Sequence, residues 1–264
     1  MGNKNIKILV SAHKQYRMPE EDIYLPLHVG AEGKNDLGYT KDNTGDNISS
    51  KNPYYCELTG LYWAWKNLDF DYLGVAHYRR HFYLKKKGDK WQSLLTSSQA
   101  QELCDNFDII LPSKRRYFIE SLYSHYAHTF DGKHLDIAEN IIEEQFPDIL
   151  PYFKNTMKQT SGYMFNMFIM NKELINEYCT FLFKVLLNME CKIDYKNLSA
   201  FESRLFGRVS ELLFNVWLNY KKDTDKNIRI KQIHSIHMEP INWWKKGMSF
   251  LKAKFCNKKY TKSF

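Results

Sequence analysis

The sequence predicts an α/β fold in which a mixed β-sheet is flanked by helices, with a helical C-terminal part. Short apolar runs recur along the chain, and several end in polar or glycine-containing loops, as buried strands do. Amphipathic helical patterns alternate with these runs and dominate residues 174–220. Apolar residues make up 44% of the 264 residues and charged residues 26%, which suits a globular chain with a sizeable core.

The first third of the chain predicts two strands and one helix around a long polar loop. The first strand is a short apolar run, whereas the second is weaker, edge-like and ends near Gly30. The loop after it is rich in Gly, Asp, Asn and Ser, and long ordered loops in compact domains are often functional. The predicted elements are strands at 6–10 and 24–31, the loop at 32–53 and a helix at 55–67.

The rest of the chain alternates strands and helices without an internal repeat or a dividing linker. The strand at 72–76 ends abruptly in the motif HYRR, residues 77–80. We therefore expect residues 1–240 to form one domain. The other predicted elements are helices at 98–106, 122–146, 174–189 and 202–220 and strands at 108–111 and 163–170.

The net charge of +8 is concentrated in a basic aromatic tail, residues 241–264. This tail holds seven lysines and no acidic residue, so residues 1–240 carry a net charge of only +1. A nearly neutral body argues against nucleic acid as a partner. Four apolar residues recur at helical spacing, with the lysines mostly beside them, which is typical of a membrane-surface helix. The alternative is a solvated tail whose two tryptophans dock on the core. The apolar stripe consists of Trp244, Met248, Leu251 and Phe255.

Cysteine usage and hydropathy predict a cytoplasmic chain, peripheral on the inner face of the plasma membrane. The five cysteines are scattered and form no C-x-x-C pair, which favours a reducing compartment. No run approaches the roughly 18 apolar residues that a membrane span needs. No apolar stretch near the first residue has the length of a signal peptide.

Familiar catalytic signatures are missing from the sequence. There is no glycine-rich phosphate loop, no nucleophile elbow and no zinc-binding H-E-x-x-H. Two D-x-D triplets occur, at 69–71 and at 223–225. The first precedes a strand rather than following it, and the second lies in a lysine-flanked polar segment. Both are therefore interpreted as surface turns.

The HYRR motif is the strongest candidate for chemistry. Guanidinium groups bind phosphate through paired, charge-assisted hydrogen bonds, so Arg79 and Arg80 at a strand end suit a diphosphate. Because adjacent residues of a strand alternate faces, we expect His77 and Arg79 to face one side and Tyr78 and Arg80 the other. The structural alternative is an ion pair between the arginines and acidic loop residues.

Three segments resemble a bacterial family of capsular and exopolysaccharide glycosyltransferases, formerly catalogued as a domain of unknown function. They are DNTGDNISSKNPYYCELTGLYWAWKN, YLGVAHYRRHF and NMFIMNKELINEYCTFLF, with the motif order ELT–YWAWKN–HYRR, and the similarity covers roughly residues 5–220. The resemblance implies a single GT-A-like (Rossmann-like) sheet. It also implies transfer of a hexose, galactose or galactofuranose, from a UDP-sugar to a lipid-linked oligosaccharide in capsule or surface polysaccharide synthesis.

On a GT-A plan, donor contacts come from the ends of the first strands, the polar loop and HYRR. Gly30 suits a close approach of backbone to ligand, because it has no Cβ. Glu57 is either a donor contact or only a favourable charge at a helix start. The implied donor-binding residues are Ser11, Ala12, His13, Lys14, Gly30, Ala31, Asp46, Asn47, Ser49, Glu57, His77, Tyr78, Arg79 and Arg80.

Because HYRR stands where a D-x-D usually stands, we expect the arginines to neutralise the leaving diphosphate and no cofactor to be required. The alternative is a divalent metal such as Mn²⁺ or Mg²⁺. Imidazoles are good metal ligands, so histidines could hold such an ion, although their spacing does not demand it. The histidines considered are His77, His125, His128, His234 and His237.

The acceptor side is predicted from the helix at 202–220. Its polar face carries Arg204, Arg208 and Glu211 at helical spacing, either as a salt-bridged solvent face or as a cleft wall. In the second case Glu211 is a candidate base for the acceptor hydroxyl, with Asp131 and Asp136 as rivals. The expected catalytic residues are Glu211 and Asp131, and the expected acceptor-binding residues are His125, His128, Asn166, Arg204 and Arg208.

Two other function classes remain open from the sequence. A phosphate-ester hydrolase or nucleotidyltransferase could use paired arginines, but it ordinarily needs clustered acidic metal ligands. A non-catalytic carbohydrate- or nucleotide-binding module would suit the 16% aromatic content. That module gives no special reason for an arginine pair at a strand end.

The tail yields the first testable prediction. Deleting residues 241–264 should abolish co-sedimentation with anionic liposomes while turnover on a short soluble acceptor persists, because each lysine near an anionic surface contributes up to about 1 kcal/mol. High salt should weaken binding of the full chain, since charges are screened beyond about 10 Å at 0.1 M. Sedimentation of the truncated protein, or its unfolding, would contradict the membrane interpretation.

Overall fold

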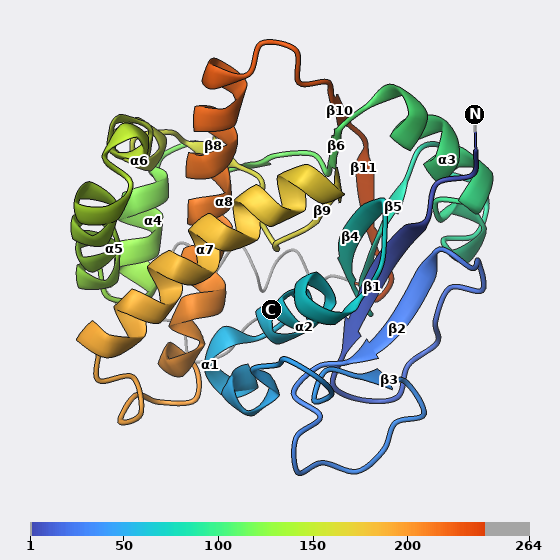
Figure 1. Cartoon of the computed structure of the whole chain (residues 1–264), viewed down its shortest axis with the longest axis horizontal. Coiled ribbons are helices and arrows are strands. Elements are labelled where there is room, and N and C mark those ends of the chain that lie inside the picture. The colour runs from blue at the N-terminus through green and yellow to red at the C-terminus, as the bar shows by residue number, and fades with distance from the viewer. Residues whose placement is uncertain (1, 241–264) are drawn as a thin grey trace. The chain divides into compact units, whose positions relative to one another are not determined.

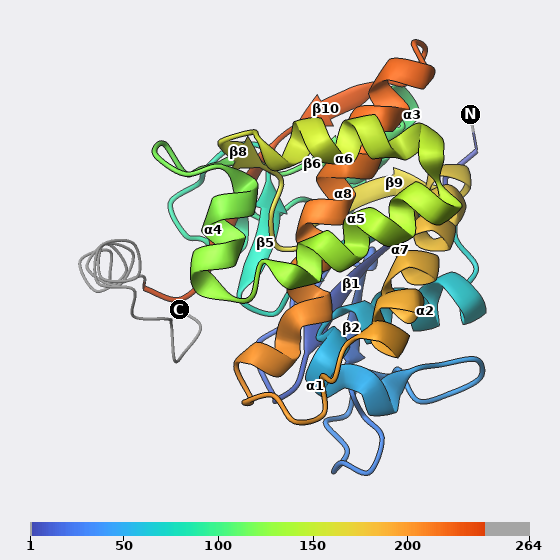
Figure 2. The ribbon, with the colours of Figure 1, turned by 90° about the vertical axis from the view of Figure 1, so that its left-hand side faces the viewer.

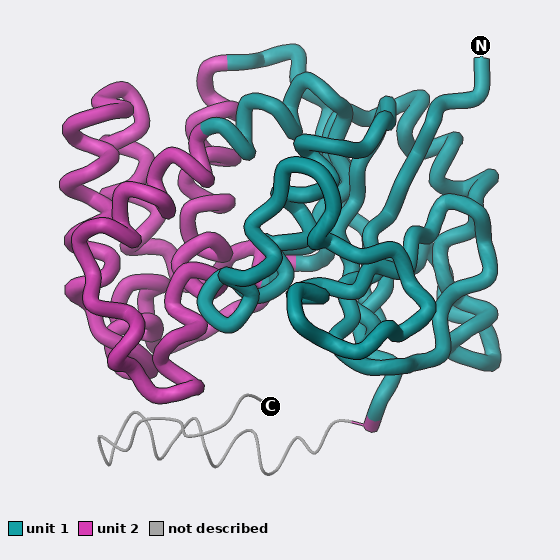
Figure 3. Tube along the Cα trace, turned by 60° about the horizontal axis from the view of Figure 1, so that its bottom comes forward, with its two compact units in different colours: residues 1–113, 165–180, 225–239 teal, residues 114–164, 181–224, 240–264 magenta. Residues whose placement is uncertain are grey.

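The computed structural model describes residues 2–240 of the chain. Contacts divide the chain into two compact units, each built from several stretches of sequence (Figure 3). Among the described residues, no helix is both long enough and apolar enough to cross a membrane. The predicted tail helix lies outside the described residues. Unit 1 holds residues 2–113, 165–180 and 225–239, and the described part of unit 2 holds 114–164, 181–224 and Pro240.

Unit 1 is built on one mixed sheet (Figure 1). Its strands are β1 (Ile6–Ala12), β2 (Tyr24–His28), β3 (Thr40–Lys41), β4 (Tyr72–His77), β5 (Arg80–Tyr83), β6 (Ile109–Leu111), β9 (Phe168–Asn171), β10 (Ile230–Gln232) and β11 (His234–His237). The main row has the order β10-β6-β9-β4-β1-β2-β3, and β5 pairs with both β4 and β11. Within this row β1 is parallel to β2 and β4, whereas β9 is antiparallel to β4 and β6.

The helices of unit 1 connect these strands. They are α1 (Asn52–Tyr55), α2 (Leu58–Asn67), α3 (Ser97–Asn106) and the first half of α7 (Lys172–Lys192), with 3₁₀ turns at Ser49–Lys51 and Trp91–Ser93. Helix α3 begins at a capping box in which Thr96 and Gln99 satisfy each other's backbone N–H groups. Crossovers through helices are what allow neighbouring strands to run parallel.

Unit 2 is mainly helical. Its elements are β7 (Arg115–Arg116), α4 (Leu122–Thr129), α5 (Lys133–Gln145), α6 (Leu150–Met157), β8 (Ser161–Gly162), the second half of α7 and α8 (Leu205–Thr224), with 3₁₀ turns at Pro147–Ile149 and Glu202–Arg204. Helix α6 packs along α8, and α5 contacts both (Figure 2). Strands β7 and β8 form a separate antiparallel pair.

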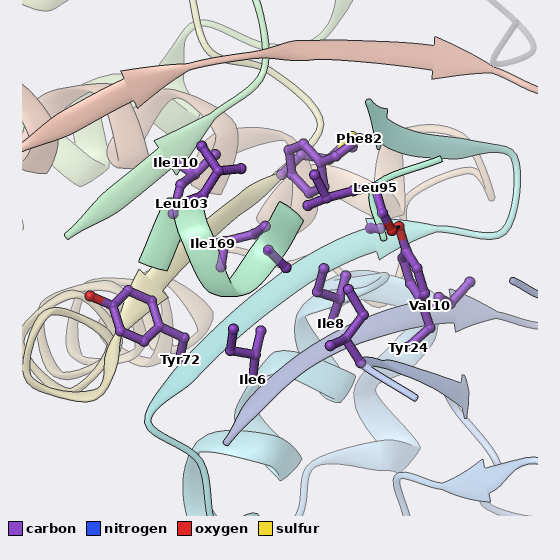
Figure 4. Close-up of a cluster of buried hydrophobic side chains, with 14 of the residues drawn as sticks. Ile6, Ile8, Val10, Tyr24, Tyr72, Phe82, Leu95, Leu103, Ile110 and Ile169 are labelled. Atoms are coloured by element: carbon purple, nitrogen blue, oxygen red, sulfur yellow. Dashed lines mark hydrogen bonds between the residues drawn. The ribbon is translucent and has the colours of Figure 1, made fainter. Parts of the chain in front are cut away.

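The core of unit 1 forms around β1, which is buried along nearly its whole length, as expected for an interior strand of a parallel sheet. Side chains from β1, β2, β4, β5, β6, β9 and α3 meet in one cluster (Figure 4). Gly74 of β4 allows the strands to pack closely, because a Cβ there would lie 2.9 Å from the Ile169 side chain and 3.1 Å from Ile8. The buried strands predicted at 6–10, 72–76 and 108–111 are confirmed as β1, β4 and β6, whereas β5 was not predicted.

Two predicted elements are interrupted by left-handed backbone. The helix expected at 55–67 begins only at Leu58 as α2, because Cys56 (φ 53°) separates it from α1, which ends at Tyr55. The strand expected at 163–170 begins only at Phe168, because Phe165 (φ 74°) and Asn166 (φ 50°) cannot join an extended ladder. Residues that carry a Cβ rarely adopt such φ angles, so the sequence did not reveal either interruption.

Several other expectations need correction. Strand β2 is not an edge, because it pairs with β3 as well as with β1. The helix expected at 122–146 is divided at Asp131 and Gly132 into α4 and α5. Strands β10 and β11 were not predicted. The D-x-D at 69–71 does precede β4, with Asp69 paired to Lys172, whereas Asp223 belongs to the last turn of α8.

His81 of β5 is a fully buried imidazole in this core. Its ring lies 6.1 Å from that of Tyr24 and 6.0 Å from that of Trp91. Burial lowers the pKa of His81 to about 4, because a charged ring is poorly solvated there. The imidazole is therefore neutral in the folded protein at neutral pH.

This burial predicts an acid-sensitive stability. A histidine in the unfolded chain has a pKa near 6.5, whereas His81 in the folded chain has a pKa of about 4. Between these two values the unfolded state binds a proton that the folded state does not bind. Stability should therefore fall as the pH falls through this window, by up to about 3 kcal/mol from His81. Denaturant unfolding of native protein and of His81→Gln at pH 7, 6 and 5 measures it. The variant should lose less stability than the native chain, and parallel curves would contradict the assignment.

Candidate functional site

The carboxyl ends of β1, β2 and β4 meet at one edge of the unit 1 sheet. In the strand register, Ser11 stands opposite both Leu27 and His77, and Ala12 stands opposite His28. Ser11 and Ala12 thus belong to β1 itself rather than to the loop after it. In open α/β sheets, ligands bind at this kind of edge.

Two buried polar atoms at this edge have no hydrogen-bond partner among the described residues. They are the Ser11 hydroxyl oxygen and Nδ1 of His28. A buried polar atom without a partner costs about 1–3 kcal/mol, so a ligand that supplies partners would recover this cost. Burial lowers the pKa of His28, which keeps its ring neutral and able to both donate and accept. The sheet edge therefore has unmet hydrogen-bonding capacity.

The HYRR motif forms a tight hairpin turn. Strand β4 ends at His77 and the antiparallel β5 begins at Arg80, so Tyr78 and Arg79 form the connection. The expectation that alternate residues face opposite sides of one strand is wrong, because the chain reverses here. Tyr78 is buried, whereas Arg79 and Arg80 are half-buried.

Two cations and two aromatic rings pack around the ring of Tyr78. Lys14 Nζ lies 5.5 Å and the Arg79 guanidinium carbon 5.1 Å from the centroid of its ring. The rings of His13 and Tyr16 pack edge-on at 5.3 and 5.1 Å. Cations held over an aromatic face keep much of their charge available to an anion. His13 and Lys14 after β1 therefore lie beside Tyr78 and Arg79, and the binding of a donor by these residues stays a prediction.

Arg79 already has one anionic partner. Its Nη1 donates to Oε2 of Glu239 at 3.2 Å, and its backbone oxygen accepts from the Met238 N–H at 2.9 Å. Lys90 Nζ donates to the carbonyl oxygens of His237 and Met238, which fixes the same segment. The ion pair that the structural alternative predicted for this arginine therefore exists, with a residue that the sequence did not suggest.

A strained segment before β9 joins three distant motifs. His77 Nε2 lies 2.6 Å from the backbone oxygen of Phe165, and the Arg80 guanidinium carbon lies 3.5 Å from the centroid of the Phe165 ring. The next residue, Asn166, donates from Nδ2 to Oε1 of Glu57 at 2.8 Å. Left-handed residues with side chains cost about 1–3 kcal/mol each and cluster at functional sites.

This strained contact brings Glu57 and Asn166 next to HYRR, which sequence reasoning did not foresee. It had placed Asn166 with the acceptor residues and left Glu57 open between a site contact and a helix charge. Glu57 is the N-cap residue of α2 but makes no side-chain cap bond. Phe165 was missed altogether, because an aromatic residue in an apolar run carries no chemical signal.

The polar loop is organised by Asp42, which the sequence did not single out. Its buried carboxylate accepts from the N–H groups of Gly30 at 2.7 Å and Ala31 at 3.0 Å, and from the hydroxyls of Thr59 and Ser49. Gly30 is required here for its φ of 65° and because a Cβ would lie 2.4 Å from the Asn52 side chain. The conformation and packing of the loop itself therefore require glycine at position 30.

The other predicted loop residues are engaged within the same loop. Asp46 Oδ1 accepts from the Tyr62 hydroxyl at 3.1 Å, and Asn47 Oδ1 accepts from the Ser49 N–H at 3.1 Å. Ser49 is 1% exposed. These contacts show how the three residues shape the loop, and their contact with a donor stays a prediction.

The predicted acceptor and catalytic residues lie in unit 2, apart from Asn166. Arg208 Nη1 donates to Oε1 of Glu211 at 3.1 Å, and the Glu211 side chain is largely buried. The solvent-face interpretation of Glu211 is therefore wrong. Asp131 Oδ1 accepts from the Lys133 N–H at the start of α5, and Arg204 closes the 3₁₀ turn before α8.

His125 and His128 share a carboxylate that sequence reasoning missed. Glu120 accepts from both Nδ1 atoms, at 2.8 and 2.7 Å. Burial alone would raise the pKa of Glu120, but the two histidine hydrogen bonds bring it below its usual value. Among residues 2–240, no group of three or more His, Cys, Asp or Glu side chains converges to hold a metal ion.

Comparison with known proteins assigns the family. Residues 7–223 match the model of a domain of unknown function, DUF4422. The chain belongs to the DUF4422 family. It is also similar to an apo structure of the bifunctional glycosyltransferase WbbM, with 32% identity and a TM-score of 0.83. The match covers 89% of this chain and 46% of that one, so the DUF4422 chain spans about half of WbbM's length. No curated protein matches.

These findings confirm the α/β fold class and the glycosyltransferase-like family. A mixed sheet flanked by helices, as in a GT-A-like fold, is what the DUF4422 chain has in unit 1. The link to capsule synthesis and the roles of the motif residues stay predictions.

Proposed function

We propose that this chain is a glycosyltransferase that uses a UDP-sugar donor. The observation that carries the proposal is the cationic, aromatic-lined hairpin at residues 78–80, beside the unsatisfied Ser11 and His28 at the sheet edge. A nucleoside diphosphate-sugar offers hydrogen-bonding groups for the second feature and two phosphates for the first. The similarity to WbbM, a bifunctional glycosyltransferase, supports the same reaction class.

The donor would bind with its diphosphate over the hairpin. As the bond between sugar and diphosphate breaks, negative charge grows on the leaving phosphate oxygens. Arg79, Arg80 and Lys14 supply guanidinium and ammonium groups that stabilise this charge more in the transition state than in the ground state. His77 is a positioning residue, since its ring bonds to the Phe165 carbonyl.

The finer assignments extend the proposal. The transferred sugar is galactose or galactofuranose, and the acceptor is a lipid-linked oligosaccharide of capsule or surface polysaccharide synthesis. The acceptor hydroxyl loses its proton to Glu211 or Asp131, and Arg208 orients the Glu211 carboxylate. His125, His128, Asn166 and Arg204 would contact the acceptor. The basic tail would hold the enzyme on the cytoplasmic face of the plasma membrane.

Donor binding is tested with two variants of opposite expected effect. Arg79→Ala should weaken UDP-sugar binding by about 1.5–3 kcal/mol, the scale of a hydrogen bond to a charged group. Glu239→Gln should strengthen it several-fold, because the carboxylate no longer occupies the Arg79 guanidinium. Thermal shift and calorimetric titration over a panel of UDP-sugars measure both affinities.

Arg229→Ala is the matched control, since this arginine pairs with Asp108 on the same sheet. It should change donor affinity little. If Arg79→Ala lowers the melting temperature with donor affinity unchanged, Arg79 is structural. Donor binding without transfer to any acceptor would favour the nucleotide-binding module.

Transfer activity should survive chelation by EDTA. The physical reason is that the hairpin arginines provide the positive charge that a D-x-D-bound metal would otherwise bring to the diphosphate. The measurement is sugar transfer after dialysis against EDTA, with and without added Mn²⁺ or Mg²⁺. Activity that is lost in EDTA and restored by either ion would show that the arginines do not suffice.

A further inference from the structure

The loop between β7 and α4 presents an exposed apolar tip. Phe118 is 81% exposed and its neighbour Ile119 is 57% exposed. Among the described residues, one other large apolar side chain is classed as exposed, Leu187 of α7 at 39%. Single exposed apolar residues are ordinary, but two adjacent ones at a loop tip mark an interaction surface.

Buried neighbours anchor this tip on both sides. On one side, Tyr117 donates its N–H to the Thr160 oxygen at 2.8 Å, and its buried ring lies 4.2 Å from that of His125. On the other side, the buried Glu120 carboxylate is bonded to His125 and His128. The loop is therefore held in one conformation at its base, and only the tip faces outward.

The backbone at Phe118 is strained. Its φ of 58° is left-handed, which is a genuine outlier for a bulky residue and costs about 1–3 kcal/mol. Its ring is mostly exposed, so packing within this chain returns little of that cost. A glycine at this position would avoid the strain, so the aromatic side chain is explained better by an external contact than by folding.

The charge beside the tip indicates what that contact is. Residues 114–116 are Lys-Arg-Arg, and residues 113–119 contain no acid. Lys114 and Arg116 are exposed, with Lys114 Nζ 5.1 Å from the centroid of the Tyr163 ring, and Arg115 packs 4.9 Å over the Tyr117 ring. Apolar side chains flanked by exposed cations are complementary to an anionic bilayer, which offers acyl chains below a layer of phosphates.

We propose that Phe118 and Ile119 insert into the interfacial region of an anionic membrane while Lys114 and Arg116 contact headgroup phosphates. The inference deepens the proposed function, since it places unit 2 at the surface where a lipid-linked acceptor resides. The contact itself requires no catalysis. It is also separate from the tail, so every variant below retains residues 241–264.

The deciding variant is Phe118→Gly in the full chain. Glycine adopts the left-handed angle without strain, so the melting temperature should hold or rise. Partitioning onto phosphatidylglycerol–phosphatidylcholine vesicles, measured by sedimentation, should nevertheless fall about tenfold, because the ring that enters the interface is gone. Leu187→Ser is the matched control, which removes an exposed apolar side chain elsewhere, and it should leave partitioning within about twofold of native.

Two further variants keep the test decisive. Ile119→Ser should lower partitioning in the same direction as Phe118→Gly. A Lys114→Gln and Arg116→Gln double variant should bind anionic vesicles less than the native chain at low salt. At high salt the two proteins should bind equally, because salt screens the electrostatic attraction that the variant lacks. Vesicles of phosphatidylcholine alone should bind the native chain far less than the anionic vesicles.

Native-like partitioning of Phe118→Gly and Ile119→Ser would overturn the proposal, as would failure of the native chain to bind anionic vesicles. If these variants bind vesicles normally but transfer poorly to an acceptor with a long lipid, the tip contacts the acceptor and the membrane proposal is wrong. Stabilisation by UDP-sugars is read separately, because donor residues belong to unit 1. Failure of the glycosyltransferase proposal therefore leaves the vesicle result standing, and the reverse also holds.

Discussion

The buried carboxylate of Asp42 is the interaction on which the candidate donor site depends. A carboxylate with no exposed surface is tolerated only when hydrogen bonds satisfy it, and here two backbone N–H groups and two hydroxyls do so. These partners come from the end of β2, from the polar loop and from α2. One anion thus fixes three segments beside the sheet edge that carries Ser11 and His28.

Backbone strain is the second constraint on the region around the HYRR hairpin. Cys56, Phe165 and Asn166 adopt angles that local sequence disfavours, so the surrounding packing must hold them. These angles bring the segment before β9 within hydrogen-bond distance of both the α2 N-terminus and β4. The three sequence motifs that carry the family resemblance are therefore neighbours in space, which explains how they can serve one site.

The sequence alone predicted the strands and helices that follow from the spacing of apolar residues. The buried strands β1 and β4 and the long helices α7 and α8 follow from apolar spacing, since burial and pattern are directly linked. Positive φ at Cys56 and Phe165 is imposed by tertiary packing, so no local pattern announced it. The solvent-face alternative for Glu211 failed because α8 is buried along most of its length, Glu211 included. Asp42 and Glu120 went unnoticed because their partners are distant backbone groups or histidines several residues away.

Glu239 gives the Arg79 site an internal competitor. Its carboxylate lies two residues beyond the end of β11, so its local concentration around the guanidinium is set by tethering and does not fall when the protein is dilute. An anion that binds Arg79 competes with this carboxylate for the charge of the guanidinium. A small anion such as inorganic phosphate would exchange the ion pair with Glu239 for one contact of its own, so its net gain in binding free energy would be small. A ligand that also reached other groups at the sheet edge would gain more than it displaces, so the ion pair would favour large polyanionic ligands over abundant small ones.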